Sequence, residues 1–360
     1  MEHRGNPIPG GSVRVVARRA PRGSSMRIVH AVRSDGFAGV ERHVARLARA
    51  QAERGEDVLV IGGSPPDMVR ELGGVLHRPA STVRDVAREL QVHGRWSDVV
   101  HVHMTAAEIA AGLTVRGSRQ GPAVVTTRHF AAPRGRGLQG PAVAAIARRA
   151  VSAQIAISEF VADHVDGPST VVHPGVHTAP RGDHQQKVIL ILQRLEKEKE
   201  TALAIRAAAA SGLTELGWRV RIAGTGTERD RLGALSSELA LDVEFLGHRS
   251  DVPDLMDKSG LLLAPCAVEG LGLSVLEAMA RSLPVVAADA GGHAELLAGL
   301  DERALFTPGD VRDAGDRLRS LALDDRGRRA YGHAAASRQR ERFTLEAQVA
   351  GTAAVYRSLR

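Results

Sequence analysis

The chain has 360 residues, of which 43% are hydrophobic, 25% charged and only 3% aromatic. This length exceeds what one hydrophobic core usually serves and predicts two domains, while the scarcity of aromatic rings argues against stacking platforms for single-stranded nucleic acid. Cys266 is the single cysteine, which excludes an intrachain disulfide and a cysteine-based zinc site and favours a reducing, cytoplasmic setting. No apolar run approaches the roughly 20 residues that span a bilayer.

The positive charge is concentrated at the N-terminus. Residues 1–25 contain five arginines and one glutamate, and so carry +4 of the net +7. Because this segment is rich in proline and glycine and has no long apolar run, we expect a disordered basic tail, not a signal peptide. Translation starts either at Met1 or at Met26. The modest charge that remains makes nucleic-acid binding the least favoured function, and it leaves contact with an anionic membrane surface open.

From Met26 onward, short β-branched runs alternate with amphipathic helical stretches. The first half predicts strands at 26–32, 57–63, 98–104, 123–128 and 153–158, and helices at 39–55 and 83–93. The proline- and glycine-containing segment 173–186 indicates a linker. The second half predicts strands at 187–193, 218–224, 242–247, 260–265 and 283–288, followed by a helical end over 309–360.

This alternation is typical of an α/β protein, here with two Rossmann-like, doubly wound parallel-sheet domains that face a cleft. We expect an N-terminal domain over 26–178 and a C-terminal domain over 187–345. Such folds bind ligands at the carboxyl ends of their strands, so the loops there are the candidates for a functional site.

The loop after the strand 260–265 begins the motif EGLGLSVLEAMA, at 269–280. Gly270, Leu271 and Gly272 would let the backbone approach a ligand closely, and Ser274 would cap or open the helix that follows. That helix is apolar on most sides, so Glu277 needs a partner, which the two hydroxyls of a sugar diol would supply. Free N–H groups at the helix start would bind a phosphate. Alternatively, the carboxylate simply interacts with the helix dipole.

The motif resembles the E-x7-E signature of the family-4 glycosyltransferases, which are retaining enzymes of the GT-B fold, and the flanking residues 283–297 are also similar to that family. The resemblance extends over nearly all of 26–345. It implies that Glu277 holds the ribose of a nucleotide-diphosphate sugar and that Glu269 contacts hydroxyls of the donor sugar. It further implies that a last helix, 346–360, crosses back to the N-terminal domain.

The same resemblance implies how the donor diphosphate is held. Arg194 and Lys199 match two family cations, and charges placed there would stabilise the negative charge of the leaving group. Lys197 is the rival of Lys199, and a plain solvated charge cluster is the alternative for the whole segment. Gly39 would present its N–H group to the distal phosphate.

Two histidines complete the site that the resemblance implies. His129, at the end of a strand, matches the family's active-site histidine, with His103 as its rival. The backbone at His248 would meet the nucleobase. Most of the 15 histidines read as surface or satisfied core residues, and the sequence predicts no metal site because the HVH run at 101–103 offers too few ligands. The family's usual glycines are replaced at three positions, Ala38, Gln193 and Glu200.

Together these features predict a retaining glycosyltransferase that needs no metal or other cofactor and moves a hexose-like unit from a nucleotide sugar to a small-molecule, glycan or lipid acceptor. It would act in the cytoplasm or at the inner face of the membrane. A sugar-nucleotide epimerase on the same scaffold, or a non-catalytic sugar-nucleotide-binding partner, is the alternative. In the acceptor loop 128–141, Arg134 and Arg136 would either meet an anionic acceptor or lie in a solvated loop.

Overall fold

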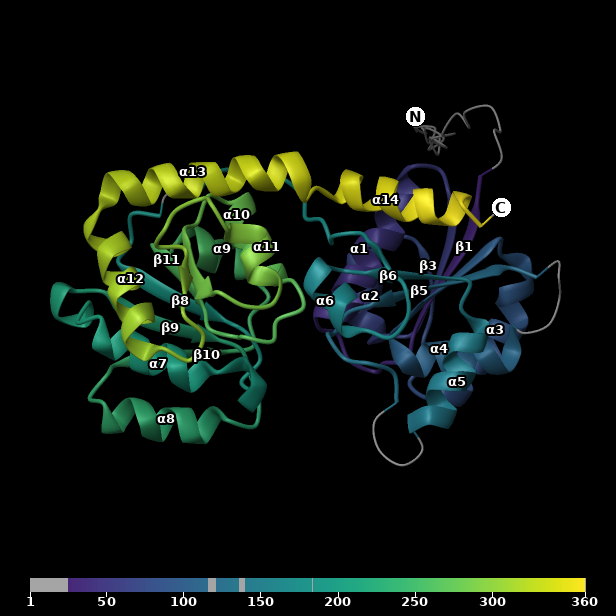
Figure 1. Ribbon diagram of the computed structural model, residues 1–360, viewed down its shortest axis with the longest axis horizontal. Helices are drawn as coiled ribbons and strands as arrows, with labels where there is room; N and C mark the ends of the chain where they lie inside the picture. Colours follow the sequence, from purple (N-terminus) through teal and green to yellow (C-terminus); the bar gives the residue numbers. More distant parts are fainter. Residues whose placement is uncertain (1–24, 116–120, 136–139, 183, 360) are drawn as a thin grey trace, which may run out of the picture.

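The computed structural model describes residues 25–115, 121–135, 140–182 and 184–359. Within them the chain forms two parallel sheets, each packed with helices (Figure 1). This architecture confirms the predicted fold class. The basic tail at 1–24 and Arg136 lie outside the described residues.

The first sheet has seven strands in the order β3-β2-β1-β4-β5-β6-β7. Residues of β1 alternate between two cores, because Ile28 packs with one helical layer while Val29 and Ala31 pack with the other. Helices therefore cover both faces of the sheet, as a buried parallel sheet requires. The elements are β1 (Arg27–Val32), α1 (Gly39–Glu53), β2 (Asp57–Ile61), α2 (Pro65–Leu72), β3 (Leu76–Arg78), α3 (Val83–His93), β4 (Val99–His103), α4 (Met104–Thr114), β5 (Ala123–Arg128), α5 (Gly140–Ala150), β6 (Ala153–Ala156), α6 (Glu159–His164) and β7 (Thr170–Val171).

The second sheet has six strands in the order β10-β9-β8-β11-β12-β13. Its strand order reverses between β8 and β11, and a crevice for ligands forms outside the carboxyl ends at such a switch point. The elements are β8 (Val188–Leu192), the short helix η2 (Lys197–Lys199), α7 (Thr201–Ala210), β9 (Arg219–Ala223), α8 (Arg229–Glu238), β10 (Val243–Gly247), α9 (Val252–Asp257), β11 (Leu261–Ala264), α10 (Leu273–Ala280), β12 (Val285–Ala288), α11 (Gly292–Leu297) and β13 (Leu305–Phe306).

The predicted helical end over 309–360 is confirmed, and short breaks divide it into α12 (Val311–Leu323), α13 (Asp325–Arg342) and α14 (Leu345–Arg357). The breaks occur where side chains cap a new helix start. Asp324 accepts a hydrogen bond from the Gly327 N–H, and Thr344 accepts one from the Ala347 N–H. As Figure 1 shows, α13 runs along the second sheet and α14 continues over the first. There Tyr356 joins the core between β1 and α1.

The two sheets meet through the carboxyl ends of their strands. The Ser158 hydroxyl, just after β6, donates to the Gly270 carbonyl at 2.6 Å, and its oxygen also caps α6 by accepting from the Val161 N–H. The Glu295 carboxylate on α11 accepts from the N–H groups of Glu159 and Phe160. The loop after β11 is thereby fixed against the first sheet. In the part of the chain that the structure describes, no helix has the length and apolar character needed to cross a membrane.

Candidate active site

Two loops at the switch point of the second sheet are joined by a short ion pair. The Lys199 ammonium, at the end of η2, lies 2.6 Å from a Glu269 carboxylate oxygen in the loop after β11. Beside it, the Ala267 N–H donates to the Glu200 carboxylate at 3.1 Å, and the Cys266 thiol contacts the Glu198 carbonyl at 3.2 Å. The structure therefore brings Lys199 and Glu269 together and holds their backbones in place.

Both members of this pair are charged at neutral pH. Burial lowers the pKa of Lys199, but the attraction of Glu269 and the hydrogen bond to it outweigh burial and leave that pKa raised. Burial likewise raises the pKa of Glu269, and the positive charge of Lys199 more than reverses this effect, so the pKa is lowered. A partly buried cation and anion in contact can each interact strongly with a polar ligand that enters between them.

Arg194 lies near this pair but in solvent. Its side chain is 54% exposed and forms an ion pair with Glu198 at 3.0 Å. The positive charge of Arg194 acts to lower the pKa of Lys199, but less strongly than Glu269 raises it. Lys197 is exposed, whereas Lys199 is largely covered and is the lysine that forms the ion pair with Glu269. Gln193 stands where the family has glycine and braces the loop, because its amide donates to the Lys199 carbonyl and to the Thr201 hydroxyl, both at 2.8 Å.

The segment Gly270–Leu271–Gly272 passes close to other backbone. A Cβ atom on Gly270 would lie 2.7 Å from the His129 carbonyl oxygen of the first domain. Gly272 has φ +99° and forms the N-cap of α10, and Leu271 is buried. The expectation that Ser274 caps this helix is wrong, because α10 already begins at Leu273 and its cap makes no side-chain hydrogen bond. Gly270 thus serves close packing between the two domains, whereas Gly272 packs against His293 within the second domain.

Glu277 points toward the first domain. Its carboxylate lies 2.8 Å from the Arg46 guanidinium on α1, and Arg46 also holds Glu71 of α2 at 3.2 Å. The expectation that Glu277 needs a partner is confirmed, although the partner here is a cation. Gly39, the first residue of α1, lies beside Leu273, whose Cδ1 would be 3.7 Å from an added Cβ. The start of α10 therefore lies against the start of α1.

His129 and His103, the two candidate histidines, lie in direct contact. His129 follows β5 and His103 ends β4, and their Nε2 and Nδ1 atoms lie 3.1 Å apart. Burial, with a smaller contribution from the charge of Arg128, lowers the pKa of His129 to about 3, so its ring is neutral at physiological pH. The His129 carbonyl lies against the Gly270 backbone, which places this residue beside the loop after β11.

His248 lies apart from these groups. It follows β10 on the surface, and its side chain makes no hydrogen bond or ion pair with any residue that the structure describes. The neighbouring Arg249 is engaged by Asp251 at 2.6 Å.

Two residues of the site, His293 and Arg46, escaped sequence reasoning, and the expectation for Arg134 is wrong. His293 on α11 is buried beside Gly272, its Nδ1 has no hydrogen-bond partner among the described residues, and its charge would lower the pKa of Glu269. Arg46 reads in the sequence only as one more arginine on an amphipathic helix. Arg134, which we expected in solvent or on an acceptor, is buried in an ion pair with Glu108 at 2.6 Å, because the loop folds inward. For His293, the one signal in the sequence was its position directly after Gly291 and Gly292.

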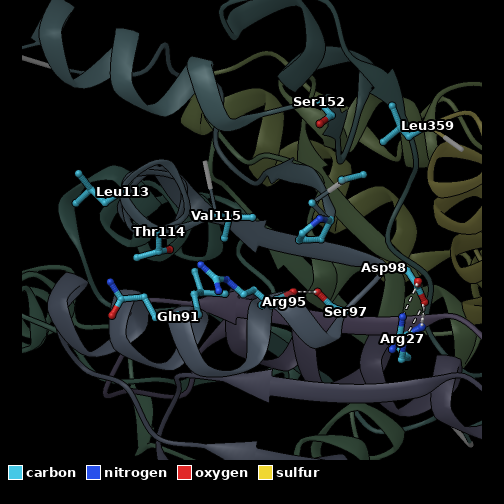
Figure 2. A pocket seen from close by; sticks show the side chains of 15 residues that line it. Arg27, Gln91, Arg95, Ser97, Asp98, Leu113, Thr114, Val115, Ser152 and Leu359 are labelled. Atoms are coloured by element: carbon cyan, nitrogen blue, oxygen red, sulfur yellow. Dashed lines mark hydrogen bonds and ion pairs between the residues drawn. The ribbon is translucent and has the colours of Figure 1, made fainter. Parts of the chain in front are cut away.

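A hollow in the first domain lies at the opposite edge of the sheet. Figure 2 shows its lining, in which Arg27 begins β1 and pairs with Asp98 at 3.2 Å, just before β4. These are the amino ends of the strands. Parallel sheets bind ligands at the carboxyl ends, so this hollow is not the candidate site.

Comparison with known sequences points to one group of enzymes. The family described as "Glycosyltransferase Family 4" matches residues 37–180, and "Glycosyl transferases group 1" matches residues 177–338. The lipopolysaccharide core biosynthesis mannosyltransferase LpsB of Rhizobium meliloti (strain 1021) is 30% identical over 236 residues, which cover 59% of this chain and 67% of LpsB. The N-acetyl-alpha-D-glucosaminyl L-malate synthase of Bacillus anthracis is 28% identical over 173 residues, covering 48% of this chain and 45% of the synthase.

Solved structures show the same architecture. The crystal structure of Anabaena HepE in complex with UDP and glucose superposes with a TM-score of 0.79 at 21% identity, and covers 92% of this chain and 100% of HepE. A glycosyltransferase from Rickettsia africae superposes with a TM-score of 0.73 at 17% identity, covering 93% of this chain and 99% of that enzyme. At these identities the likeness shows the GT-B fold.

Proposed function

Because this chain belongs to the family-4 glycosyltransferases and transfers a sugar from a nucleotide sugar, we propose that it does so with retention of anomeric configuration and without a bound metal ion. The observation that carries the proposal is the Lys199–Glu269 ion pair at the switch point of the second sheet, beside the first turn of α10. The donor would be a nucleotide-diphosphate hexose of the cytoplasm. The acceptor would be a hydroxyl group presented by the first domain.

The diphosphate would bind next to Lys199, with Arg194 turning in from solvent. These two cations would carry the charge that a divalent metal carries in other transferases, and they would be worth most when the leaving oxygen becomes negative. The N–H groups at the start of α10, and the N–H group of Gly39 across the interface, would add donors to the phosphate oxygens.

The carboxylates would bind the two sugar rings of the donor. Glu269 would exchange part of its contact with Lys199 for hydroxyls of the transferred sugar, and Glu277 would exchange Arg46 for the ribose diol. His129 would contact the transferred sugar from the first domain, and the backbone at His248 would face the base. Every one of these groups except His248 lies where the carboxyl edges of the two sheets meet.

In the reaction, the bond between the anomeric carbon and the diphosphate oxygen breaks while the acceptor oxygen bonds to the same face of the sugar. The hydroxyl proton of the acceptor passes to the departing diphosphate oxygen. Contact between the two domains would exclude water, which would otherwise compete as the acceptor.

A thermal-shift screen with UDP-, GDP- and ADP-sugars identifies the donor, and incubation with that labelled donor reports the reaction. We expect transfer or slow hydrolysis that persists in EDTA, with the anomeric proton coupling in the NMR spectrum of the product unchanged from that of the donor. An inverted product, or activity only with added metal, would refute the proposal. Isomerised donor would indicate an epimerase, and binding alone would indicate a non-catalytic partner.

A further inference from the structure

Five histidines are buried together under the carboxyl edge of the first sheet. They are contributed by β1, α1, β4 and the end of β5, and their exposed fractions lie between 0% and 7%. The five are His30, His43, His101, His103 and His129. Of these five, only His129 has a role in the proposed site, and His103 lies in contact with it.

Three of the rings form one line of hydrogen bonds that ends at His129. The Gln51 amide oxygen lies 2.7 Å from His30 Nε2. His30 Nδ1 lies 3.1 Å from His103 Nε2, and His103 Nδ1 lies 3.1 Å from His129 Nε2. Among the described residues, no group pairs with Nδ1 of His129. The line therefore begins at a buried amide on α1 and ends at a residue of the proposed site.

The other end of the Gln51 amide is also engaged. Its NH₂ group donates to the Tyr356 hydroxyl at 3.4 Å, and that hydroxyl lies 2.6 Å from His101 Nδ1. His101 Nε2 lies 2.7 Å from the Thr127 hydroxyl. In the structure the amide oxygen thus faces His30 and the amide nitrogen faces Tyr356, and an amide oxygen can only accept a hydrogen bond.

The protonation of the line follows from burial. Burial lowers the pKa of His30 to about 4 and that of His129 to about 3, and it lowers the pKa of His103 well below its ordinary value. Each ring is therefore neutral at pH 7 and has one N–H donor and one lone pair. The Gln51 oxygen only accepts, so His30 carries its proton on Nε2. His103 must then carry its proton on Nε2 as well, and so must His129.

We propose that Gln51 is a positioning residue that acts through His30 and His103 to hold His129 as the Nε2–H tautomer, so that Nδ1 offers a lone pair to a hydroxyl group of the bound sugar. The second half of this statement rests on the proposed function, and the first half does not. A fixed tautomer lets His129 accept a hydrogen bond from a hydroxyl donor without the cost of first shifting a proton.

Nitrogen NMR of protein labelled with ¹⁵N-histidine tests the tautomer without any substrate. At pH 7.5 we expect the His129 resonances, assigned by loss in His129→Gln, to be those of a neutral ring with its proton on Nε2. A proton on Nδ1 in the wild-type chain would overturn the inference. Zinc or another metal found with the protein by elemental analysis and bound to these rings would overturn it too, because a metal takes the lone pairs that the line uses.

Gln51→Leu removes the acceptor at the head of the line at similar volume. We expect the His129 signals to move toward a mixture of tautomers, and kcat to fall about tenfold, equivalent to about 1.4 kcal/mol, with the donor KM changed less than about twofold. Thr127→Val is the matched control, since it removes a buried hydroxyl of the other branch and should leave the His129 tautomer unchanged. An unchanged tautomer in Gln51→Leu would overturn the inference.

The two proposals fail separately. If His129 has the expected tautomer but no sugar is transferred, the proposed function fails while the role of Gln51 stands. If transfer occurs and the His129 tautomer does not respond to Gln51→Leu, the role of Gln51 fails alone.

Discussion

Lys199 and Glu269 form an ion pair in the unliganded protein, with 2.6 Å between the ammonium and a carboxylate oxygen. A diphosphate that replaces the carboxylate at Lys199 leaves the cation paired throughout, so its contribution grows mainly as the leaving oxygen becomes negative. The ion pair thus keeps two charged side chains in place at low cost until a donor arrives.

Lys199→Ala should therefore lower kcat by about 100-fold or more while changing the donor KM only a few-fold, the range seen when one stabilising donor is removed from a transition state. Arg194→Ala should act in the same direction. Lys197→Ala is the control, because that side chain is exposed two residues before Lys199, and its kinetics should equal the wild type. Steady-state rates of transfer check this. Equal losses in Lys197→Ala and Lys199→Ala would contradict it.

Glu200 adopts a backbone conformation that suits glycine, with φ +53°, at one of the positions where the family usually has glycine. Glu200→Gly and Glu200→Ala both lose the hydrogen bond to the Ala267 N–H, so the difference between them isolates the backbone strain. We expect Glu200→Gly to be the more stable by about 1 kcal/mol, since only alanine bears a strained Cβ. Urea unfolding measures the difference. Equal midpoints would show that the loop relaxes freely.

Ala38, by contrast, needs no glycine. As N-cap of α1 it has φ −133° and ψ −155°, an extended conformation that alanine adopts without strain. The replacement of a usual family glycine therefore has opposite consequences at Ala38 and at Glu200, and only the backbone angles distinguish them.

At the scale of elements, β1, β4 and α1 are joined by neutral imidazoles, which makes this layer sensitive to acid. Burial lowers the pKa of all five rings. Below the ordinary histidine pKa of about 6.5, these five histidines bind protons in the unfolded chain but stay neutral in the folded chain. Stability is therefore complete above that pH and is lost as the pH falls toward the folded values.

Each such proton removes about 1.4 kcal/mol of unfolding free energy per pH unit, and five act together, so acid unfolding should occur near pH 5 for a protein of ordinary stability. Urea unfolding between pH 7.5 and 5.5 should show that the unfolding free energy falls ever more steeply with pH, with a slope that approaches the uptake of five protons. His333→Gln, at an exposed site, should leave that slope unchanged. A constant unfolding free energy down to pH 5 would contradict the prediction.

At the scale of the whole molecule, the Arg46–Glu277 ion pair joins the two domains at the position where the proposed function places the ribose. The ribose diol and the guanidinium would compete for one carboxylate. The unliganded protein would then be held closed by a contact that the donor must replace.

Glu277→Ala should weaken nucleotide binding about tenfold, because the diol loses a charged acceptor worth about 1.5–3 kcal/mol, an effect partly offset because the nucleotide no longer has to displace Arg46. Arg46→Ala should instead strengthen nucleotide binding and increase the radius of gyration of the unliganded protein. Calorimetric titration and small-angle scattering report these quantities. Arg49→Ala is the control, since Arg49 forms its ion pair with Glu53 on its own helix and with no other residue that the structure describes. Identical affinities in all four proteins would remove Glu277 from the site.

The sequence alone determined the parallel α/β architecture, the positions of most strands, and the loops that lie at the carboxyl ends of β8 and β11. These features depend on local periodicity, on turn residues and on the spacing of the Glu269–Glu277 motif. Each of these signals lies within a short stretch of the sequence. Strands as short as β3 and β7 carry too little pattern to be seen.

Only the tertiary structure decided which charges meet. Residues far apart in the chain, such as Arg46 with Glu277 and Arg134 with Glu108, become partners because the sheets bring their helices and loops to one edge. The hydrogen-bonded line from Gln51 to His129 needs β1, β4 and β5 side by side, and strand order is a property of the folded sheet. Pairing between distant segments is set by packing, and no short stretch of sequence contains it.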